Sequence, residues 1–381
     1  MRRTRYQAEH EAFRRSVRAF LEREVIPAQP GRHRDDPVGR AVWIAAGKQG
    51  LLGFEAPPEF GGTGLRDFRY NRVLAEETMR VGATGLGFGV HNDIVLPYLL
   101  RFGTPEQRER WLPRFCSGEL IGAIAMTEPG GGGDHPGVMT TAHHDGADFI
   151  VTGAKTFTTN GIQADLVIVV VRTNPTVRPS RGISLLVVER GMPGFKPGPT
   201  VEKTQLSAAH GGELVFTDVR VPAANLIGEL HQGFQQLISM LPRERLSIAV
   251  GAAAAARTVL GLTLRYCQKR STLGRPAGSF QRNRFALAEM ATELESAESY
   301  LDQAIEKHRA GRFSTADASM AKWWTAELQK RVIDRCLQLP EGQGYLHEFP
   351  LAKTFFGSRI QTIYGGTAEI MKEIISRPLA G

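Results

Sequence analysis

The feature that most constrains the fold of this 381-residue chain is a change in the spacing of its apolar side chains. Up to about residue 125 they recur at the spacing of amphipathic helices. Between residues 126 and 228, short runs such as Leu166–Val171 and Ile183–Val188 predict strands, separated by turn signals such as Asp145-Gly146. Helical spacing then returns in longer stretches. The order helix, strand, helix predicts three successive regions.

Several short helices are expected in the first region and four longer ones in the last. The expected helices cover Tyr6–Val25, Val42–Gly50, Asn71–Val81, Gln107–Cys116, Gln232–Ser271, Phe280–Arg309, Thr315–Leu339 and Phe349–Ile375. Four long amphipathic helices in succession are typical of a bundle. We therefore predict a mostly α fold with a central β-domain: an N-terminal helical domain (1–125), a small β-barrel or sandwich (126–228) and a C-terminal four-helix bundle (229–381).

The charge balance is basic, with 47 Lys and Arg against 39 Asp and Glu and a net charge of +8. This balance is compatible with nucleic acid or with acidic ligands such as CoA and acidic carrier proteins, but a generally arginine-rich surface is the favoured explanation. The basic residues are scattered and no RNA-binding or helix-turn-helix motif occurs, so nucleic acid is not expected as a partner. No apolar run approaches the length of a membrane span, so none is expected.

Three cysteines, Cys116, Cys267 and Cys336, are widely separated and form no CxxC pair. This spacing argues against a metal site or a disulfide framework and fits a reducing, cytoplasmic setting. The first residues include several arginines, but the segment up to Phe20 has the acidic and apolar pattern of an amphipathic helix and is not expected to be a signal peptide.

A glycine-rich turn follows Ala125-Met126-Thr127-Glu128-Pro129, with four glycines at positions 130–133. Glycines leave no Cβ in the way of a close ligand, and successive amides can line a hollow for an anion. The run is neither a G-x-G-x-x-G dinucleotide fingerprint nor a P-loop, because no Gly-Lys-Ser/Thr follows it. Together with the polar segment Lys155–Gly161, it indicates a site for a flat, phosphate-bearing cofactor.

The order of six motifs resembles that of the acyl-CoA dehydrogenase family, over nearly the whole chain. The motifs are Met126–Asp134, Lys155–Gly161, Glu213–Pro222, Arg243–Leu246, Arg270 with Gly274 and Gln281, and Ile363–Ile370. The likeness is greatest to the long-chain members. It implies a helical domain, a β-domain and a bundle, in agreement with the apolar spacing, and it implies an oxidoreductase that acts on the CH–CH bond of an acyl thioester.

In that reaction a carboxylate removes an α-proton while a β-hydride leaves to N5 of FAD. Most family members carry the base where this chain has Gly365, whereas long-chain and isovaleryl members carry it as the Glu of Glu-Arg-Leu, which is Glu244 here. The resemblance thus implies that Glu244 is the base and that Gly365 offers its backbone N–H to the thioester oxygen. It also implies substrate contacts at Gly133, Arg245 and Gly366. By itself, Glu244 also fits an ordinary ion pair on a helix surface.

The resemblance implies that several parts of the chain bind FAD. The expected contacts are Ala125, Met126, Thr127, Gly132, Gly133, Phe157, Thr158, Thr159, Arg270, Gln281, Gln338, Gly342, Thr367 and Glu369. Four of these, from Arg270 to Gly342, match residues that reach the FAD of a neighbouring subunit, which implies a homo-oligomer, a dimer or a homotetramer built as a dimer of dimers. An electron-transfer flavoprotein is the expected electron acceptor.

Some positions depart from the family's pattern. Gly131 and Gly133 replace Ala and Ser, Phe157 replaces Trp, Leu273 replaces Phe, and Glu341 stands where a glycine approaches the FAD phosphates. Because a carboxylate near a pyrophosphate is repulsive, Glu341 is expected to weaken FAD binding unless it turns to solvent or pairs with an arginine.

Three alternatives stay open. A member that has lost FAD would act as a structural partner in a complex. One that keeps the flavin could be an oxidase or an N-hydroxylase of the same fold. A carrier-protein thioester in place of a CoA thioester would put the same dehydrogenation in a biosynthetic pathway.

Overall fold

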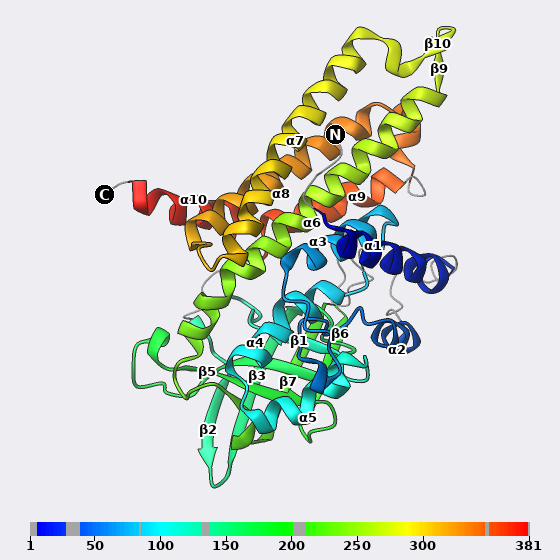
Figure 1. The fold of residues 1–381 in the computed structure, drawn as a ribbon. Helices are drawn as coiled ribbons and strands as arrows, with labels where there is room; N and C mark the ends of the chain where they lie inside the picture. Colours follow the sequence, from blue (N-terminus) through cyan, green and yellow to red (C-terminus); the bar gives the residue numbers. More distant parts are fainter. Residues whose placement is uncertain are drawn as a thin grey trace. The chain divides into compact units, whose positions relative to one another are not determined.

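The computed structural model describes residues 6–27, 39–83, 85–131, 137–200, 211–346 and 350–379 (Figure 1). The α-helices are α1 (Ala8–Phe20), α2 (Arg40–Lys48), α3 (Phe68–Arg80), α4 (Leu96–Phe102), α5 (Pro105–Cys116), α6 (Gly233–Lys269), α7 (Gln281–Arg309), α8 (Thr315–Gln338), α9 (Pro350–Ser358) and α10 (Ala368–Ser376). The strands are β1 (Gly122–Ala125), β2 (Thr141–Asp145), β3 (Asp148–Thr158), β4 (Leu166–Arg172), β5 (Ile183–Glu189), β6 (Phe195–Thr200), β7 (Gly212–Pro222), β8 (Leu226–Ile227), β9 (Ser271–Thr272) and β10 (Arg275–Pro276). The predicted fold class, helical at both ends with a sheet between, is confirmed.

The chain divides into two compact units. The bundle unit contains Met1–Arg15, Asp67–Ala83 and Pro242–Gly381, and the sheet unit contains Ser16–Arg66 and Thr84–Leu241. Each unit is described by itself below. The domain boundaries at 125 and 228 stay predictions.

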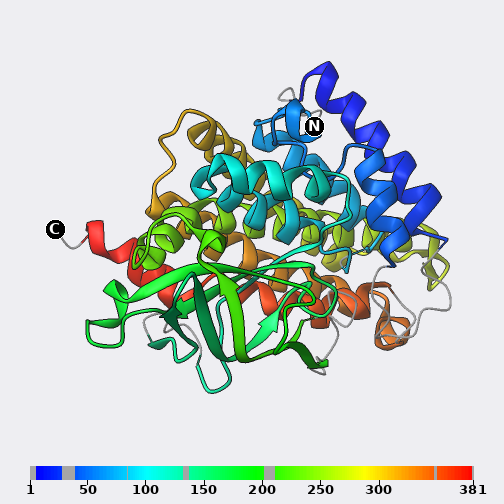
Figure 2. The same ribbon diagram turned by 90° about the horizontal axis from the view of Figure 1, so that it is seen from below.

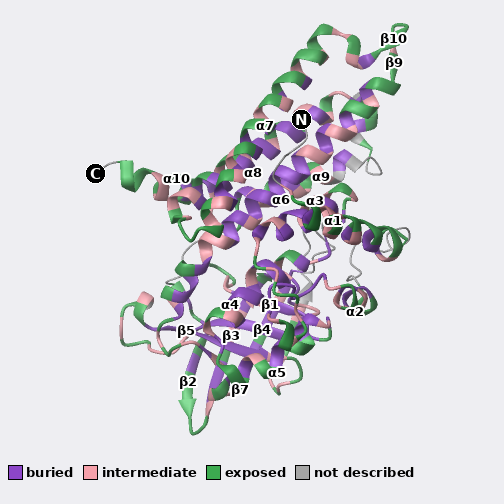
Figure 3. Cartoon of the chain, in the orientation of Figure 1, coloured by how far each residue is buried: buried purple, intermediate pink, exposed green. Residues whose placement is uncertain are grey.

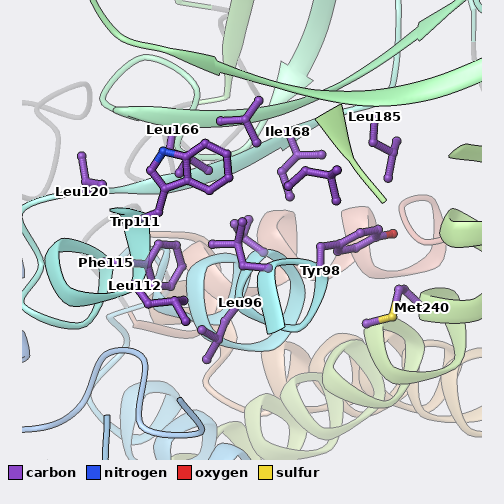
Figure 4. Close-up of a cluster of buried hydrophobic side chains, with 14 of the residues drawn as sticks. Leu96, Tyr98, Trp111, Leu112, Phe115, Leu120, Leu166, Ile168, Leu185 and Met240 are labelled. Carbon is purple, nitrogen blue, oxygen red and sulfur yellow. The ribbon is translucent and has the colours of Figure 1, made fainter. Parts of the chain in front are cut away.

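The sheet unit is built on one eight-stranded sheet, in the order β6-β7-β3-β2-β4-β5-β8, with β1 paired in parallel to β4. Alternate residues of β4 and β5 enter two different hydrophobic clusters, since successive side chains of a strand point to opposite faces. On one face, Leu166, Ile168 and Leu185 pack against α4 and α5 (Figure 4). Figure 2 shows these two helices, in cyan, on one side of the green sheet. Burial on both faces explains why β4 and β5 are continuous apolar runs.

The bundle unit packs α3 and α10 with the long helices α6, α7 and α8. Figure 1 shows the long helices running alongside one another, and the short β9–β10 hairpin joins α6 to α7. Ser314 caps α8 by accepting a hydrogen bond from Asp317 N at 3.0 Å, while the Asp317 carboxylate accepts one from Ser314 N at 3.1 Å. This reciprocal capping box accounts for the start of α8 close to its predicted position.

One expected helix is wrong, because Phe349–Ile375 forms two helices and not one. Helix α9 ends at Ser358, and α10 begins only at Ala368. Between them Gly365 and Gly366 have φ angles of +67° and +99°, which no helix accommodates. The Thr367 hydroxyl then caps α10 through Ile370 N at 3.4 Å. The apolar spacing continues across this loop, so periodicity alone could not reveal the break.

Helix α6 is the one helix within the described residues that is long and apolar enough to cross a membrane. Its most apolar window is 67% buried, as in a core helix, so length and composition are weak evidence for a membrane span. Figure 3 shows this burial in purple along α6, whereas the β9–β10 hairpin is largely exposed.

Candidate active site

The proposed base lies on a buried turn of α6 in the bundle unit. Glu244 is 5% exposed and Arg245 is 3% exposed. Arg245 donates from Nε to the carbonyl oxygen of Gly365 at 3.1 Å and from Nη1 to the hydroxyl of Ser319 at 3.4 Å. Burial lowers the pKa of Arg245, and the carboxylate of Glu244 partly opposes that shift. Two of the predicted residues, Arg245 and Gly365, are thus in contact, and Glu244 precedes Arg245 in the chain.

Side chains at the centre of the glycine loop before α10 would meet the ends of two neighbouring side chains. A Cβ on Gly365 would lie 2.4 Å from Cδ1 of Ile248, and one on Gly366 would lie 2.6 Å from Cε of Met371. Gly365 therefore cannot carry a carboxylate unless Ile248 moves. Among the described residues, none accepts a hydrogen bond from the N–H of Gly365, which leaves this donor available to a ligand.

A second buried cation, Lys322 on α8, holds the next carbonyl of the loop. Its Nζ donates to the oxygen of Gly366 at 2.5 Å, and its side chain is 0% exposed. Burial, and then the positive charge of Arg245, lower the pKa of Lys322 to about 8. The sequence analysis missed this residue. The available signal was spacing, since Lys322 shares the buried stripe of Ala318 and Thr325.

In the sheet unit, the end of β1 and the end of β3 form a second cluster of predicted residues. Ala125 is buried, and Met126 and Thr127 are half-buried. Thr156 N donates to the Thr127 carbonyl at 2.8 Å. Nζ of Lys155 donates to the Met126 carbonyl at 3.2 Å. These bonds join the segment after β1 to β3.

A buried ion pair supports this cluster. Lys155 lies 2.8 Å from the Glu128 carboxylate, which also accepts the backbone N–H groups of Met139 and Thr140 at 2.7 and 2.8 Å. Burial lowers the pKa of Lys155 to about 8, although Glu128 partly offsets this. Burial alone would raise the pKa of Glu128, but hydrogen bonds from Lys155 and Thr140 hold it below its usual value.

Phe157 lies at an irregularity in the pairing of β3 with β7, between Lys155 and Thr158. Its side chain is 59% exposed and its φ angle is +54°, an unusual combination for an aromatic residue. Next to it, the hydroxyl of Thr158 is buried and has no hydrogen-bond partner in the described part of the chain. An exposed aromatic face on strained backbone, beside an orphaned polar atom, fits a flat cofactor with polar edges. The sheet-unit residues therefore fit FAD.

Other predicted residues are placed as follows. Arg270 and Gln281 are exposed on either side of the β9–β10 hairpin, Gln338 is exposed at the end of α8, Gly342 is exposed, Thr159 is half-buried, Thr367 caps α10, and Glu369 is exposed in its first turn. Gly132, Gly133 and the side chain of Glu341 lie outside the described residues. Leu273, at the hairpin tip, is 89% exposed with a φ angle of +50°.

Comparison with known proteins agrees with this architecture. The family descriptions "Acyl-CoA dehydrogenase, N-terminal domain", "middle domain" and "C-terminal domain" match residues 7–119, 123–219 and 231–380. The chain belongs to the acyl-CoA dehydrogenase family, whose members are oxidoreductases acting on CH–CH bonds. The resemblance found in the sequence is confirmed.

Two relatives and two solved structures show the likeness. The chain is 44% identical over 375 residues to the mitochondrial long-chain specific acyl-CoA dehydrogenase of Rattus norvegicus, covering 98% of this chain and 87% of the relative. It is 33% identical over 372 residues to the mitochondrial isovaleryl-CoA dehydrogenase of Pongo abelii, covering 97% and 88%. An acyl-CoA dehydrogenase structure from Geobacillus kaustophilus has a TM-score of 0.96 at 44% identity, covering 99% of each chain. A prolyl acyl carrier protein oxidase has a TM-score of 0.92 at 27% identity, covering 99% and 100%.

Proposed function

We propose that this chain is a flavoprotein that desaturates an acyl thioester between its α- and β-carbons, with Glu244 as the base. The observation that carries the proposal is the presence of a buried carboxylate at Glu244 together with a glycine at position 365, where a Cβ would meet Ile248. Arg245, the neighbour of Glu244, contacts the carbonyl of Gly365. The base and the backbone donor thus belong to one connected cluster.

Glu244 and Gly365, both in the bundle unit, would have different roles in the reaction. The carboxylate of Glu244 would take the α-proton, and the N–H of Gly365 would donate to the thioester oxygen, which gains negative charge as that proton leaves. The C–H electrons left at the α-carbon form the new double bond as the β-hydrogen departs with its own electron pair. Burial of Glu244 would exclude water from the proton transfer.

FAD would supply the acceptor for the departing hydride. The exposed face of Phe157 would cover the flavin ring, and the carbonyls and N–H groups of Met126 and Thr127 would meet its polar edge. Arg270 and Gln281 would meet the FAD of a neighbouring subunit, which supports a homo-oligomer, either a dimer or a tetramer. Members of this family are flavoproteins, and one family neighbour is a glutaryl-CoA dehydrogenase solved with FADH₂.

The long-chain relatives favour a CoA thioester as the substrate, and a carrier-protein thioester is the second candidate. The solved prolyl acyl carrier protein oxidase, 27% identical to this chain, favours keeping that second candidate. An electron-transfer flavoprotein is the proposed acceptor of the electrons. We place the enzyme in the cytoplasm, in keeping with three cysteines that are all free and buried.

The test is an anaerobic titration of the purified protein with acyl-CoA thioesters of different lengths and with acyl carrier protein thioesters. The protein should be yellow, its FAD should be released by acid, and the flavin absorbance should bleach with the true substrate. Glu244→Gln keeps the shape of the side chain but removes the base, so bleaching should slow at least ~10²-fold while FAD and substrate stay bound. Substantial bleaching by the variant would place the base elsewhere.

The same preparation separates a dehydrogenase from an oxidase. A dehydrogenase should pass its electrons to an artificial acceptor much faster than to oxygen. Stoichiometric hydrogen peroxide during turnover in air would instead assign an oxidase. A colourless protein that takes up no added FAD would assign a structural role.

A further inference from the structure

Lys322 is a buried ammonium that packing alone does not explain. Its side chain is 0% exposed, and its Nζ makes one hydrogen bond among the described residues, to Gly366 O. Within the same part of the chain, no carboxylate oxygen lies within 4.0 Å of Nζ. A buried charge without a paired counter-charge costs stability, whereas an apolar side chain of similar length would not. A residue that persists at such a cost commonly has a functional reason.

The position of Lys322 suggests that reason. Arg245 holds the carbonyl of Gly365 from α6, and Lys322 holds the carbonyl of Gly366 from α8. We call these two contacts the carbonyl clamp. They fix consecutive peptide groups in a two-glycine loop whose φ angles are +67° and +99°. Glycine has more backbone freedom than any other residue, so a Gly-Gly loop without such contacts would sample many orientations.

We propose that Lys322 is a positioning residue for the acyl thioester, whose ammonium completes the carbonyl clamp and thereby keeps the N–H of Gly365 oriented toward the thioester oxygen. This inference rests on the proposed function, because it needs Gly365 as the donor. Lys322 acts through the loop and forms no bond to substrate. Preorganised donors stabilise developing charge without reorganising at the moment of reaction, so a loosened loop should weaken acidification of the α-carbon.

The charges around Lys322 are consistent with a positioning role. Burial lowers the pKa of Lys322 and Arg245, on α6, lowers it further by its positive charge, while Glu327 on α8 and Glu369 on α10 oppose that shift by their negative charges. Glu327 is already paired with Lys330 at 3.0 Å.

The experiment compares Lys322→Met with Lys330→Met in the full-length, FAD-loaded protein. The substitutions are identical and both lie on α8, but Lys330 is partly exposed and pairs with Glu327. The first readout is deuterium uptake by backbone amides of residues 363–367, which should rise in Lys322→Met alone. The second is exchange of the α-protons of 3,3-dimethylbutanoyl-CoA into D₂O. This probe has no β-hydrogen to transfer, so it reports proton removal alone. Because the loosened loop should weaken the donor at Gly365, the exchange rate should fall about tenfold or more in Lys322→Met.

The third readout, Tm, distinguishes positioning from structural support. Removal of an unpaired buried charge should leave Tm unchanged or raise it, so the variant should lose function without losing stability. A lower Tm together with unchanged α-proton exchange would overturn the proposal and make Lys322 structural. Lys322→Gln, which keeps an N–H donor without the charge, should be intermediate in all three readouts, and failure of both variants to fold would also make Lys322 structural.

The wild-type protein tests the proposed function separately. If it exchanges the α-protons of no acyl thioester, the proposed function fails and the inference fails with it. If the wild type exchanges them and Lys322→Met does so equally fast, only the inference fails.

Discussion

Arg245 and Gly365 are joined by a hydrogen bond of 3.1 Å from the guanidinium Nε to the carbonyl oxygen, although 120 positions separate them in the chain. The bond ties the helix that carries Glu244 to the loop that carries the backbone donor. The Glu244 carboxylate and the Gly365 N–H would act on the same substrate, so the distance between them matters. The contact of Arg245 with Gly365 helps to fix that distance. An error of about 1 Å in such a placement can cost a large factor in rate.

Arg245→Lys tests that dependence. Lysine keeps the charge but loses the planar fork that contacts Gly365 and Ser319 together, so flavin reduction by substrate should slow about tenfold or more. Stopped-flow absorbance under anaerobic conditions measures the rate, and the FAD content should not change. Arg243→Lys is the matched control, because Arg243 lies over the Phe68 ring, with its Cζ 5.3 Å from the ring centroid. Equal rates for wild type and Arg245→Lys would contradict the assigned role.

Gly365→Ala should destabilise the protein. The new Cβ meets Ile248 at 2.4 Å, and alanine must adopt a left-handed φ of +67°. We expect a loss of about 1–3 kcal/mol in the free energy of unfolding, measured in urea. In α6, a Cβ on Gly251 has nothing within 4 Å, so Gly251→Ala should be neutral or stabilising. Similar losses of unfolding free energy in Gly365→Ala and Gly251→Ala would show that a side chain at position 365 does not strain the loop.

The Glu128–Lys155 pair should make stability depend on acid pH. The pKa of Glu128 is lowered in the folded protein from its usual 4.5, so the folded state binds fewer protons than the unfolded state in that range. Its contribution is therefore present above pH 4.5 and is lost as the pH falls through the folded pKa. Urea unfolding of the wild type between pH 3 and pH 6 should show this slope.

Glu128→Gln should flatten the same slope and should also lower stability at neutral pH, by about 3–5 kcal/mol, because it leaves the Lys155 charge buried and unpaired. Glu119→Gln removes an exposed pair with Arg114 and should change stability by less than about 1 kcal/mol. A slope in Glu128→Gln as steep as that of the wild type would show that other carboxylates are responsible.

Leu273→Asn should stabilise the β9–β10 hairpin but weaken the retention of FAD. Leu273 and Gly274 both have positive φ angles, +50° and +76°, and asparagine tolerates this conformation better than leucine. The free energy of unfolding of the FAD-free protein should rise by up to about 1 kcal/mol. In the proposed homo-oligomer, contact with a neighbouring subunit would explain an exposed leucine in such a turn, and the variant should then lose FAD more readily in gel filtration. A variant that retains FAD as the wild type does would remove Leu273 from the subunit contact.

Much of the fold could be predicted because the long helices and buried strands have simple periodicity. Helices α6, α7 and α8 begin and end within a few residues of their predicted bounds. The helical segment Val90–Phe102 was harder to single out, because its first turns bury the polar residues His91, Asn92 and Asp93. Buried polar groups interrupt the apolar pattern on which such predictions depend.

The candidate site was only partly predictable, for a related reason. Motif order indicated Glu244, Arg245 and Gly365, and the structure places Arg245 in contact with Gly365 and buries Glu244. The motif order gave no sign of the contact between Lys322 and Gly366, because a hydrogen bond to a backbone carbonyl depends on loop geometry and not on the identity of the loop residue. Nor did it indicate the positive φ of Phe157, which depends on the pairing irregularity between β3 and β7.

The contact between Ile248 and position 365 limits how this enzyme could evolve. A mutation that restored a glutamate at position 365 would meet Ile248 before it offered a second carboxylate, and loss of Glu244 in the same lineage would leave no base at all. A base moved to position 365 would require a shift of the Ile248 side chain in addition to the substitution itself. A base at Glu244, as proposed, would therefore be tied to the side chain at position 248 as well as to the absence of one at position 365.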